Sequence, residues 1–201
     1  MVVERRVLVP TRFVTLEGNE VGQMELVNPL LDVLRISYEH TKKGSYLGDE
    51  VNLKGVTRFH SLVTEESRRV VAVTSYKGSR MYTLGVDPEF QGGPYAKQLL
   101  HQALEFNPQT WMTAFFDAPA MLGTLSSEGM NLELVRDLEE MSDLFSSSPA
   151  FIRGDRVRVG YISNPRLAGR LGLATNEPLK VMTHLKSNHG FEYKQYVFKL
   201  R

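Results

Sequence analysis

The stretch Val86-Asp87-Pro88-Glu89-Phe90-Gln91-Gly92-Gly93-Pro94-Tyr95-Ala96-Lys97-Gln98-Leu99-Leu100 is the part of the sequence that says most about the fold. A β-rich run, Arg80 to Val86, comes before it, and Pro94 to Phe106 has the apolar spacing of a helix. The first N–H groups of a helix have no partner within the helix, and the helix dipole favours negative charge there. A glycine-bearing turn between a strand and a helix therefore predicts a site for an anion.

The segments on either side of this stretch predict a regular order of strands and helices. We expect Asn28 to cap the first helix, with Pro29 in its first turn, and Gly78-Ser79 to form a two-residue turn between strands. The expected elements are a strand over Arg5 to Thr15, a helix from Asn28 to Gly44, a loop from Gly44 to Gly55, strands over Val56 to Val63, Arg68 to Lys77 and Arg80 to Val86, the helix over Pro94 to Phe106 and a strand over Thr110 to Phe116.

The segment Gln91-Gly92-Gly93-Pro94-Tyr95-Ala96 resembles the acyl-CoA-binding motif of the GNAT superfamily of N-acetyltransferases. That motif reads Gln/Arg-x-x-Gly-x-Gly/Ala and follows a strand that ends in Val-x-Pro. The expected order of elements also matches the family up to about residue 118. The resemblance implies an α/β GNAT-like fold: a mixed, mostly antiparallel sheet with helices on both faces. We expect a single domain over residues 1–201, with an insertion at about 130–155.

The resemblance also implies a function and the residues that serve it. It implies an acyl-CoA-dependent N-acyltransferase, with acetyl-CoA as the favoured co-substrate and a small-molecule or protein amine as the acceptor. It assigns the pantetheine arm to the backbone of Leu84, Gly85 and Val86. It assigns the pyrophosphate to the motif's first polar residue and to the backbone N–H groups that follow: Gln91, Gly92, Gly93, Tyr95 and Ala96.

The sequence departs from the family pattern at two positions. Pro94 stands where the family has its central glycine, and proline has no N–H to donate to a phosphate. Arg80, followed by Met81 and Tyr82, stands where some members carry a glutamate that acts as the general base. Both departures favour an alternative from another class of function: a catalytically inactive GNAT-fold protein that serves in binding or assembly.

The catalytic residues stay open at this stage. A general base could come from His60, Glu65 or Asp117, or from a bound water. Each also has a structural interpretation, as a packed strand residue, a solvated turn residue or a helix cap. A tyrosine often donates to the leaving thiolate in this family, and three are available: Tyr161, Tyr193 and Tyr196.

Beyond Asp117, three segments compete for the helix that the family places next. They are Ala118 to Ser127, Pro165 to Leu171, and Pro178 to Ser187, each of which leads to a glycine followed by an apolar residue. A further helix is expected over Leu132 to Phe145. The alternating residues Tyr193 to Leu200 predict a terminal strand that pairs inside the sheet.

Composition excludes several classes of function. The chain has no cysteine, so thiol catalysis, disulfides and cysteine-ligated metals are excluded. Its net charge of +1 gives no basic field for nucleic acid, and no apolar stretch approaches the roughly 18 residues of a membrane helix. His184 and His189 lie five apart and do not predict a metal pair, so no metal is expected. We expect a cytoplasmic protein. The sequence is compatible with a homodimer or with another protein partner.

Overall fold

The computed structural model describes residues 8–39, 55–115, 132–146, 156–162, 165–186 and 191–200. The chain divides into two compact units, and each is described by itself. The first unit consists of Met1–Gly78 and Tyr82–Phe106, and the second of Ser79–Met81 and Asn107–Arg201.

The first unit contains the strand–helix–meander order that the sequence predicts. Its strand order is β1-β2-β3-β4, in which β1 and β2, and β2 and β3, are antiparallel. A register shift between Leu62 and Val63 interrupts the pairing of β2 with β3. The elements are β1 (Thr11–Glu17), a 3-10 helix η1 (Gly18–Gly22), α1 (Met24–Glu39), β2 (Arg58–Thr64), β3 (Val70–Lys77), β4 (Arg80–Val86), a 3-10 helix η2 (Pro88–Phe90) and α3 (Tyr95–Phe106).

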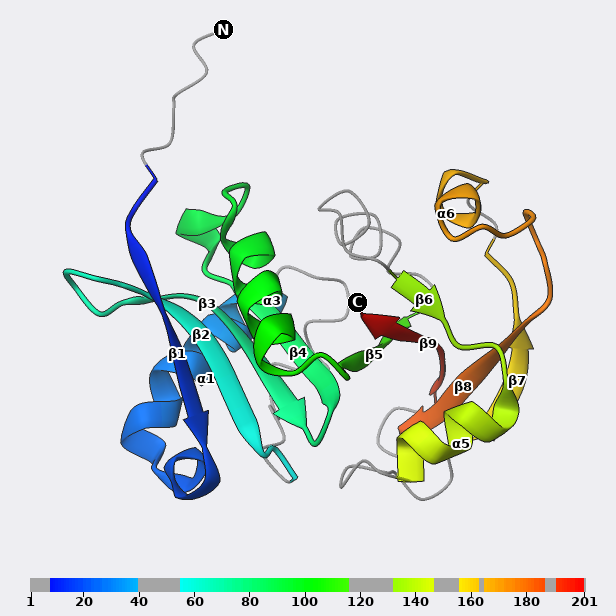
Figure 1. Cartoon of the computed structure of the whole chain (residues 1–201), viewed down its shortest axis with the longest axis horizontal. Coiled ribbons are helices and arrows are strands. Elements are labelled where there is room, and N and C mark those ends of the chain that lie inside the picture. Colours follow the sequence, from blue (N-terminus) through cyan, green and yellow to red (C-terminus); the bar gives the residue numbers. More distant parts are fainter. Residues whose placement is uncertain are drawn as a thin grey trace, which may run out of the picture. The chain divides into compact units, whose positions relative to one another are not determined.

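The two long helices of this unit cover opposite faces of its sheet (Figure 1). Along β2, Phe59 and Val63 pack with the apolar stripe of α1, whereas Leu62 packs with Leu99 of α3. Successive side chains of a strand point to opposite faces, so one strand serves both apolar clusters. The prediction of a sheet with helices on both faces is therefore confirmed in this unit.

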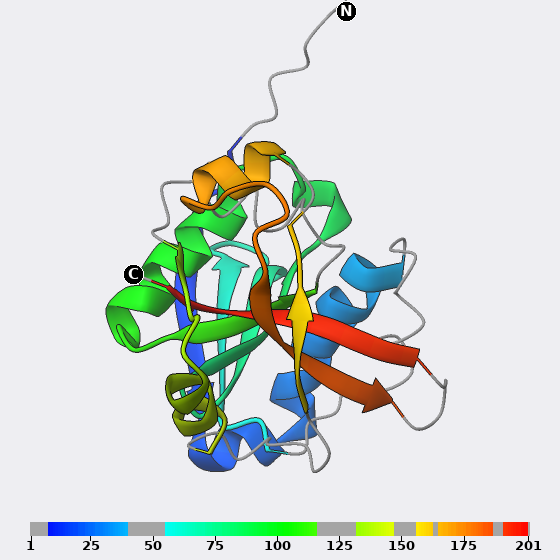
Figure 2. The same cartoon turned by 90° about the vertical axis from the view of Figure 1, so that its right-hand side faces the viewer.

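The second unit is built around its last strand. β9 pairs antiparallel with β5, with β8 and with β6, and β8 pairs antiparallel with β7. Figure 2 shows β9 in red beside β8 in dark orange. β5 pairs in parallel with the first residues of β4, at Arg80 and Met81, so the sheet is mixed but mostly antiparallel. The elements are β5 (Trp111–Phe115), β6 (Leu132–Leu134), α5 (Leu138–Ser146), β7 (Arg156–Gly160), α6 (Pro165–Arg170), β8 (Leu179–Lys186) and β9 (Phe191–Leu200).

Two of the predicted helices begin at a different residue in the structure. α1 begins at Met24, so Asn28 is not its cap and Pro29 lies inside the helix. The helix extends past the proline because a continuous stripe, which includes Val27 and Leu30, is buried on both sides of it. The helix expected from Leu132 begins only at Leu138, because residues 132–134 pair with β9 and the Asp137 carboxylate accepts the N–H groups of Glu139 and Glu140 as a cap.

The other differences fall mainly in the second half. Among the three candidate segments for a helix, Pro178 to Ser187 is ruled out, because Leu179–Lys186 forms β8 between β7 and β9. The strand β7 was not anticipated. The candidate segment at Pro165 forms a helix, α6, and the terminal strand is confirmed as β9. The first strand begins at Thr11 instead of Arg5. Ala118 to Ser127, Asp117, and the expected helix end and loop at 40–54 lie outside the described residues.

Candidate functional site

The segment between β4 and α3 begins with a capped turn. The N–H of Asp87 donates to the carbonyl of Val71 on β3 at 2.9 Å, which ties the end of β4 to the sheet. The Asp87 carboxylate accepts the N–H of Glu89 at 3.0 Å through Oδ1 and so caps the short helix η2. Pro88 is the first residue of η2, where a missing N–H costs nothing. The direction of the chain as it leaves the sheet is therefore set by the Asp87 cap and by the bond to Val71 of β3.

The glycine turn follows η2 and leads directly into α3. Gly92 has a φ of +79°, the left-handed region that favours glycine. The Gly93 N–H donates to the carbonyl of Phe90 at 3.3 Å, and the Pro94 carbonyl accepts the N–H of Gln98 at 2.9 Å. Of the N–H groups expected to face a pyrophosphate, that of Gly93 thus has an acceptor within the turn. Pro94 has no backbone N–H. The N–H groups that are still expected to face a pyrophosphate are therefore those of Gly92, Tyr95 and Ala96.

Tyr95 anchors the first turn of α3. Its side chain is buried, its hydroxyl accepts the N–H of Val9 at 2.9 Å, and its ring meets that of Phe90 edge-on with 5.6 Å between the centroids. Its backbone N–H belongs to the first turn of the helix and has no intrahelical acceptor. The side chain of Tyr95 is therefore structural, while its backbone remains suited to an anion.

The end of β4, expected to line a pantetheine arm, is closely covered by α1. A Cβ on Gly85 would lie 2.8 Å from Ser37 Oγ and 3.0 Å from Leu34 Cδ2. The Val86 carbonyl lies 2.9 Å from Ser37 Oγ and accepts the Gln91 side-chain amide at 3.2 Å. A pantetheine arm that approached the Val86 carbonyl would find it already bonded to the side chains of Ser37 and Gln91. The sequence did not point to Ser37, which lies 49 residues from Val86.

His60 is buried and is not placed to act as a general base. It is fully buried among the rings of Phe13, Tyr76 and Phe106, at centroid distances of 5.1, 5.2 and 5.0 Å. Its Nδ1 lies 2.9 Å from Thr15 Oγ1. Burial, followed by the charge of Arg58, lowers the pKa of His60 to about 4. The ring is therefore neutral at pH 7, but a substrate amine cannot reach it without opening the core.

Of the other candidate catalytic residues, Glu65 and the three tyrosines, those that the structure describes differ in their exposure to solvent. Glu65 is exposed in the turn between β2 and β3. Tyr196 is buried and its hydroxyl donates to the Tyr161 carbonyl at 2.8 Å, and burial raises the pKa of Tyr196 above its usual range. Tyr161 is 46% exposed. The side chain of Tyr193 lies outside the described residues.

Arg80, at the position where some family members carry a carboxylate, is a structural residue in this chain. It is buried, and its Nη2 donates to Thr113 Oγ1 of β5 at 2.8 Å. Its guanidinium carbon lies 5.3 Å from the centroid of the Trp111 ring. Arginine stacks readily on aromatic rings, so this side chain stabilises the parallel contact of β4 with β5. It does not replace the missing base.

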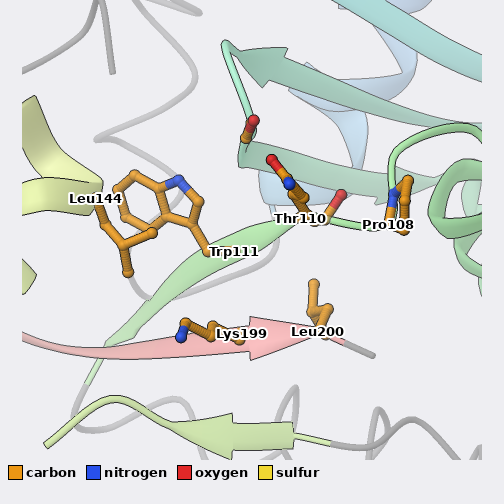
Figure 3. Close-up of a pocket in the computed structure, with 8 residues that line it drawn as sticks. Pro108, Thr110, Trp111, Leu144, Lys199 and Leu200 are labelled. Atoms are coloured by element: carbon orange, nitrogen blue, oxygen red, sulfur yellow. The ribbon is translucent and has the colours of Figure 1, made fainter. Parts of the chain in front are cut away.

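A cavity of about 530 Å³ lies in the second unit, where β5 begins and β9 ends. Figure 3 shows the Trp111 ring beside Leu144, with Lys199 and Leu200 on the neighbouring strand. Lys199 forms an ion pair with Glu140 of α5. None of the residues expected to hold acyl-CoA lines this cavity; its walls are Ser79, Pro108, Gln109, Thr110, Trp111, Leu144, Lys199 and Leu200.

The described residues contain neither a metal-binding cluster nor a membrane-spanning helix. Among those residues, no group of three or more histidine, cysteine, aspartate or glutamate side chains could hold a metal ion. In the same part of the chain, no helix has the length and apolarity needed to cross a membrane.

Comparison with known proteins gives a fold likeness and no sequence match. No protein-family model matches the chain, and no curated protein sequence matches it. NAA60 from Arabidopsis thaliana, solved in complex with acetyl-CoA, is similar over 96% of this chain and 98% of its own, with 12% identity and a TM-score of 0.44.

Two further solved structures show a similar level of likeness. PaiA N-acetyltransferase from Thermoplasma acidophilum, in complex with coenzyme A, is 12% identical over 61% of this chain and 91% of its own, with a TM-score of 0.44. A GNAT-family acetyltransferase from Bacillus cereus is 13% identical over 64% of this chain and 90% of its own, with a TM-score of 0.41. A fold does not determine activity, which depends on the residues of the site.

Proposed function

We propose that this chain is an acyl-CoA-dependent N-acyltransferase that transfers acetyl from acetyl-CoA to an amine. One feature carries the proposal: β4 leads through a capped turn and a left-handed Gly92 directly into the N-terminus of α3. Backbone N–H groups without intrahelical acceptors and the helix dipole both favour a phosphate there. The pyrophosphate would face the N–H groups of Gly92, Tyr95 and Ala96.

The reaction has definite requirements for the protein. The amine nitrogen attacks the thioester carbonyl carbon, the C–S bond breaks, and the thiolate of coenzyme A leaves. The attacking nitrogen loses a proton, and the thiolate accepts one or is stabilised by a donor. His60 is excluded from proton transfer by its burial. We propose Glu65 or a bound water as the base.

The alternative function is a binding or assembly module that has kept the fold without the catalysis. Two observations favour it. The Gly93–Pro94 pair offers no free donor to a pyrophosphate, and Arg80 holds Thr113 at a position where a base would be needed. These observations predict weaker coenzyme A binding than in a site with every donor present.

Ligand-induced stabilisation separates the two functions. Acetyl-CoA in excess should raise the melting temperature by mass action, while adenosine diphosphate serves as a control for generic phosphate binding. Catalysis can then be followed as free thiol released from acetyl-CoA in the presence of a panel of amines. The chain has no cysteine, so a thiol reagent reports only coenzyme A. Absence of any thermal shift at millimolar acetyl-CoA would overturn the proposal and support the binding module.

A further inference from the structure

Arg69 reaches from the start of β3 to the segment between β4 and the glycine turn. Its Nε and Nη2 donate to Oδ2 of Asp87 at 3.2 and 2.7 Å, and its Nη1 donates to Oε2 of Glu89 at 2.6 Å. Its guanidinium carbon lies 5.2 Å from the centroid of the Phe90 ring. One side chain therefore contacts three successive non-proline residues of the segment that precedes the turn.

These contacts continue into the turn itself. The Phe90 carbonyl accepts the Gly93 N–H, and the Phe90 ring packs edge-on against Tyr95, the first residue of α3. Asp87 uses one carboxylate oxygen for Arg69 and the other for the N–H of Glu89. A planar guanidinium can make several such bonds at fixed angles, which an ammonium cannot. The position of the glycine turn thus depends on Arg69 through Asp87 and Phe90.

Charge gives a second reason for Arg69 at this place. Asp87 and Glu89 put two negative charges within five residues of Gly92. The Asp87 side chain is only 11% exposed, so solvent screens its charge poorly. Arg69 forms ion pairs with both carboxylates. Without this cation, a phosphate at the turn would face both negative charges.

We propose that Arg69 is a positioning residue for the pyrophosphate of coenzyme A, which holds Asp87 and Glu89 in place and offsets their charge. The proposal rests on the proposed function, because it names the residue that prepares the same turn for its ligand. Arg69 itself need not touch coenzyme A. Its effect passes through the two carboxylates and through Phe90.

The first test compares two arginines in the same turn. Arg69→Met removes the charge and the bonds to both carboxylates, while Arg68→Met removes the same charge from the exposed neighbour. We expect the dissociation constant of coenzyme A, measured by calorimetry, to rise roughly tenfold in Arg69→Met, as for lost bonds to charged groups. Arg68→Met should change it by less than about twofold, because among the described residues no bond joins Arg68 to Asp87 or Glu89, and an exposed charge without such bonds is screened. Equal affinity of Arg69→Met and the unsubstituted protein would overturn the inference and leave the proposed function standing.

The second test separates charge compensation from simple structural support. Asp87→Asn and Glu89→Gln, added to Arg69→Met, remove both carboxylate charges while Asn still caps η2. We expect this triple variant to recover part of the lost affinity for coenzyme A. A purely structural role predicts no recovery, because the bonds of Arg69 are still absent, and that result would overturn the proposal.

Folding of the variants is checked by their melting temperatures without ligand. If Arg69→Met does not fold, Arg69→Lys replaces it, since lysine keeps the charge but loses the planar fork. A smaller loss of affinity is then expected, and no loss would overturn the inference. Failure of the unsubstituted protein to bind coenzyme A would overturn the proposed function and this inference together, which distinguishes it from failure of the inference alone.

Discussion

The two units are stabilised by different kinds of contact. In the first unit, α1 and α3 bury their apolar faces against opposite faces of β2 and β3, in two separate clusters. In the second unit, β9 forms ladders with β5, β6 and β8, and the described cluster around Trp111 is smaller. Packing against helices distributes stability over many side chains, whereas a shared central strand concentrates it in one segment. The second unit should therefore depend more on a single element than the first.

Removal of β9 should have the largest effect. Deletion of residues 193–201 removes most of the strand that pairs with three others, and buried side chains such as Phe198 leave with it. The loss should be comparable with the whole stability of a domain, about 5–15 kcal/mol. Trp111 is the chain's single tryptophan and is 1% exposed, so its emission reports on the second unit. An unchanged urea midpoint and tryptophan emission would show that β9 is a peripheral arm for a partner chain.

Shortening one buried side chain of α3 should have a smaller effect, because only the packing contacts of that side chain are lost. Leu99 is fully buried in the cluster under α3, and Leu99→Ala should cost roughly 2–5 kcal/mol of unfolding free energy. Lys97→Ala, an exposed position on the same helix, is the matched control and should change it by less than about 0.5 kcal/mol. Urea unfolding followed by circular dichroism measures both. Equal midpoints for the two variants would contradict the packing that we describe for the first unit.

Acid should destabilise the first unit through His60. The pKa of this histidine is about 4 when folded, against about 6.5 when unfolded, so the unfolded state binds the proton more tightly. Stability should therefore be fully present above pH 6.5 and fall as the pH is lowered to 4, by roughly 3 kcal/mol. His60→Gln should remove most of this dependence, while His101→Gln, at an exposed position on α3, should not. Urea midpoints across this pH range in the three proteins provide the test, and a slope that survives His60→Gln would exclude this cause.

The smallest expected effect concerns the glycine turn. Pro94→Gly restores one N–H beside the proposed pyrophosphate, and a net bond to a charged group contributes about 1.5–3 kcal/mol, less the cost of added backbone freedom. We expect coenzyme A to bind a few-fold to about tenfold more tightly. Pro108→Gly, beyond the other end of α3, is the control. Unchanged or weaker binding in calorimetry would mean that the missing donor does not limit affinity.

The same contrast between the units separates what could be predicted from what could not. The end of β4, the turn and α3 were predicted to within one residue at each boundary, because glycine, proline and capping residues act over a few positions. The segment that forms β8 was one of three candidates for a helix, because an apolar run of that length suits either structure. Its partners β7 and β9 decide between them, and no local signal identifies those partners.

The candidate site divides in a similar way. The position of Gly92, the missing donor of Pro94 and the helix start at Tyr95 follow from local sequence. The bonds of Arg69 to Asp87 and Glu89 span 18 and 20 residues, and neither end carries a motif. The burial of His60 depends partly on Phe106 at the end of α3, a helix that follows β2, β3 and β4 in the chain. Because the sequence does not reveal this contact, it left His60 as a candidate base.

The sequence by itself determined the strand–turn–helix at residues 80–106, the absence of cysteine chemistry, and the terminal strand, since each depends on residue type or on short-range periodicity. Only the tertiary structure decided that Leu179–Lys186 is a strand, that Pro29 lies inside a helix, and that Arg69 holds the turn. Those outcomes depend on contacts between residues far apart in the chain. Their stability comes from burial and pairing that exist only once the partners have met.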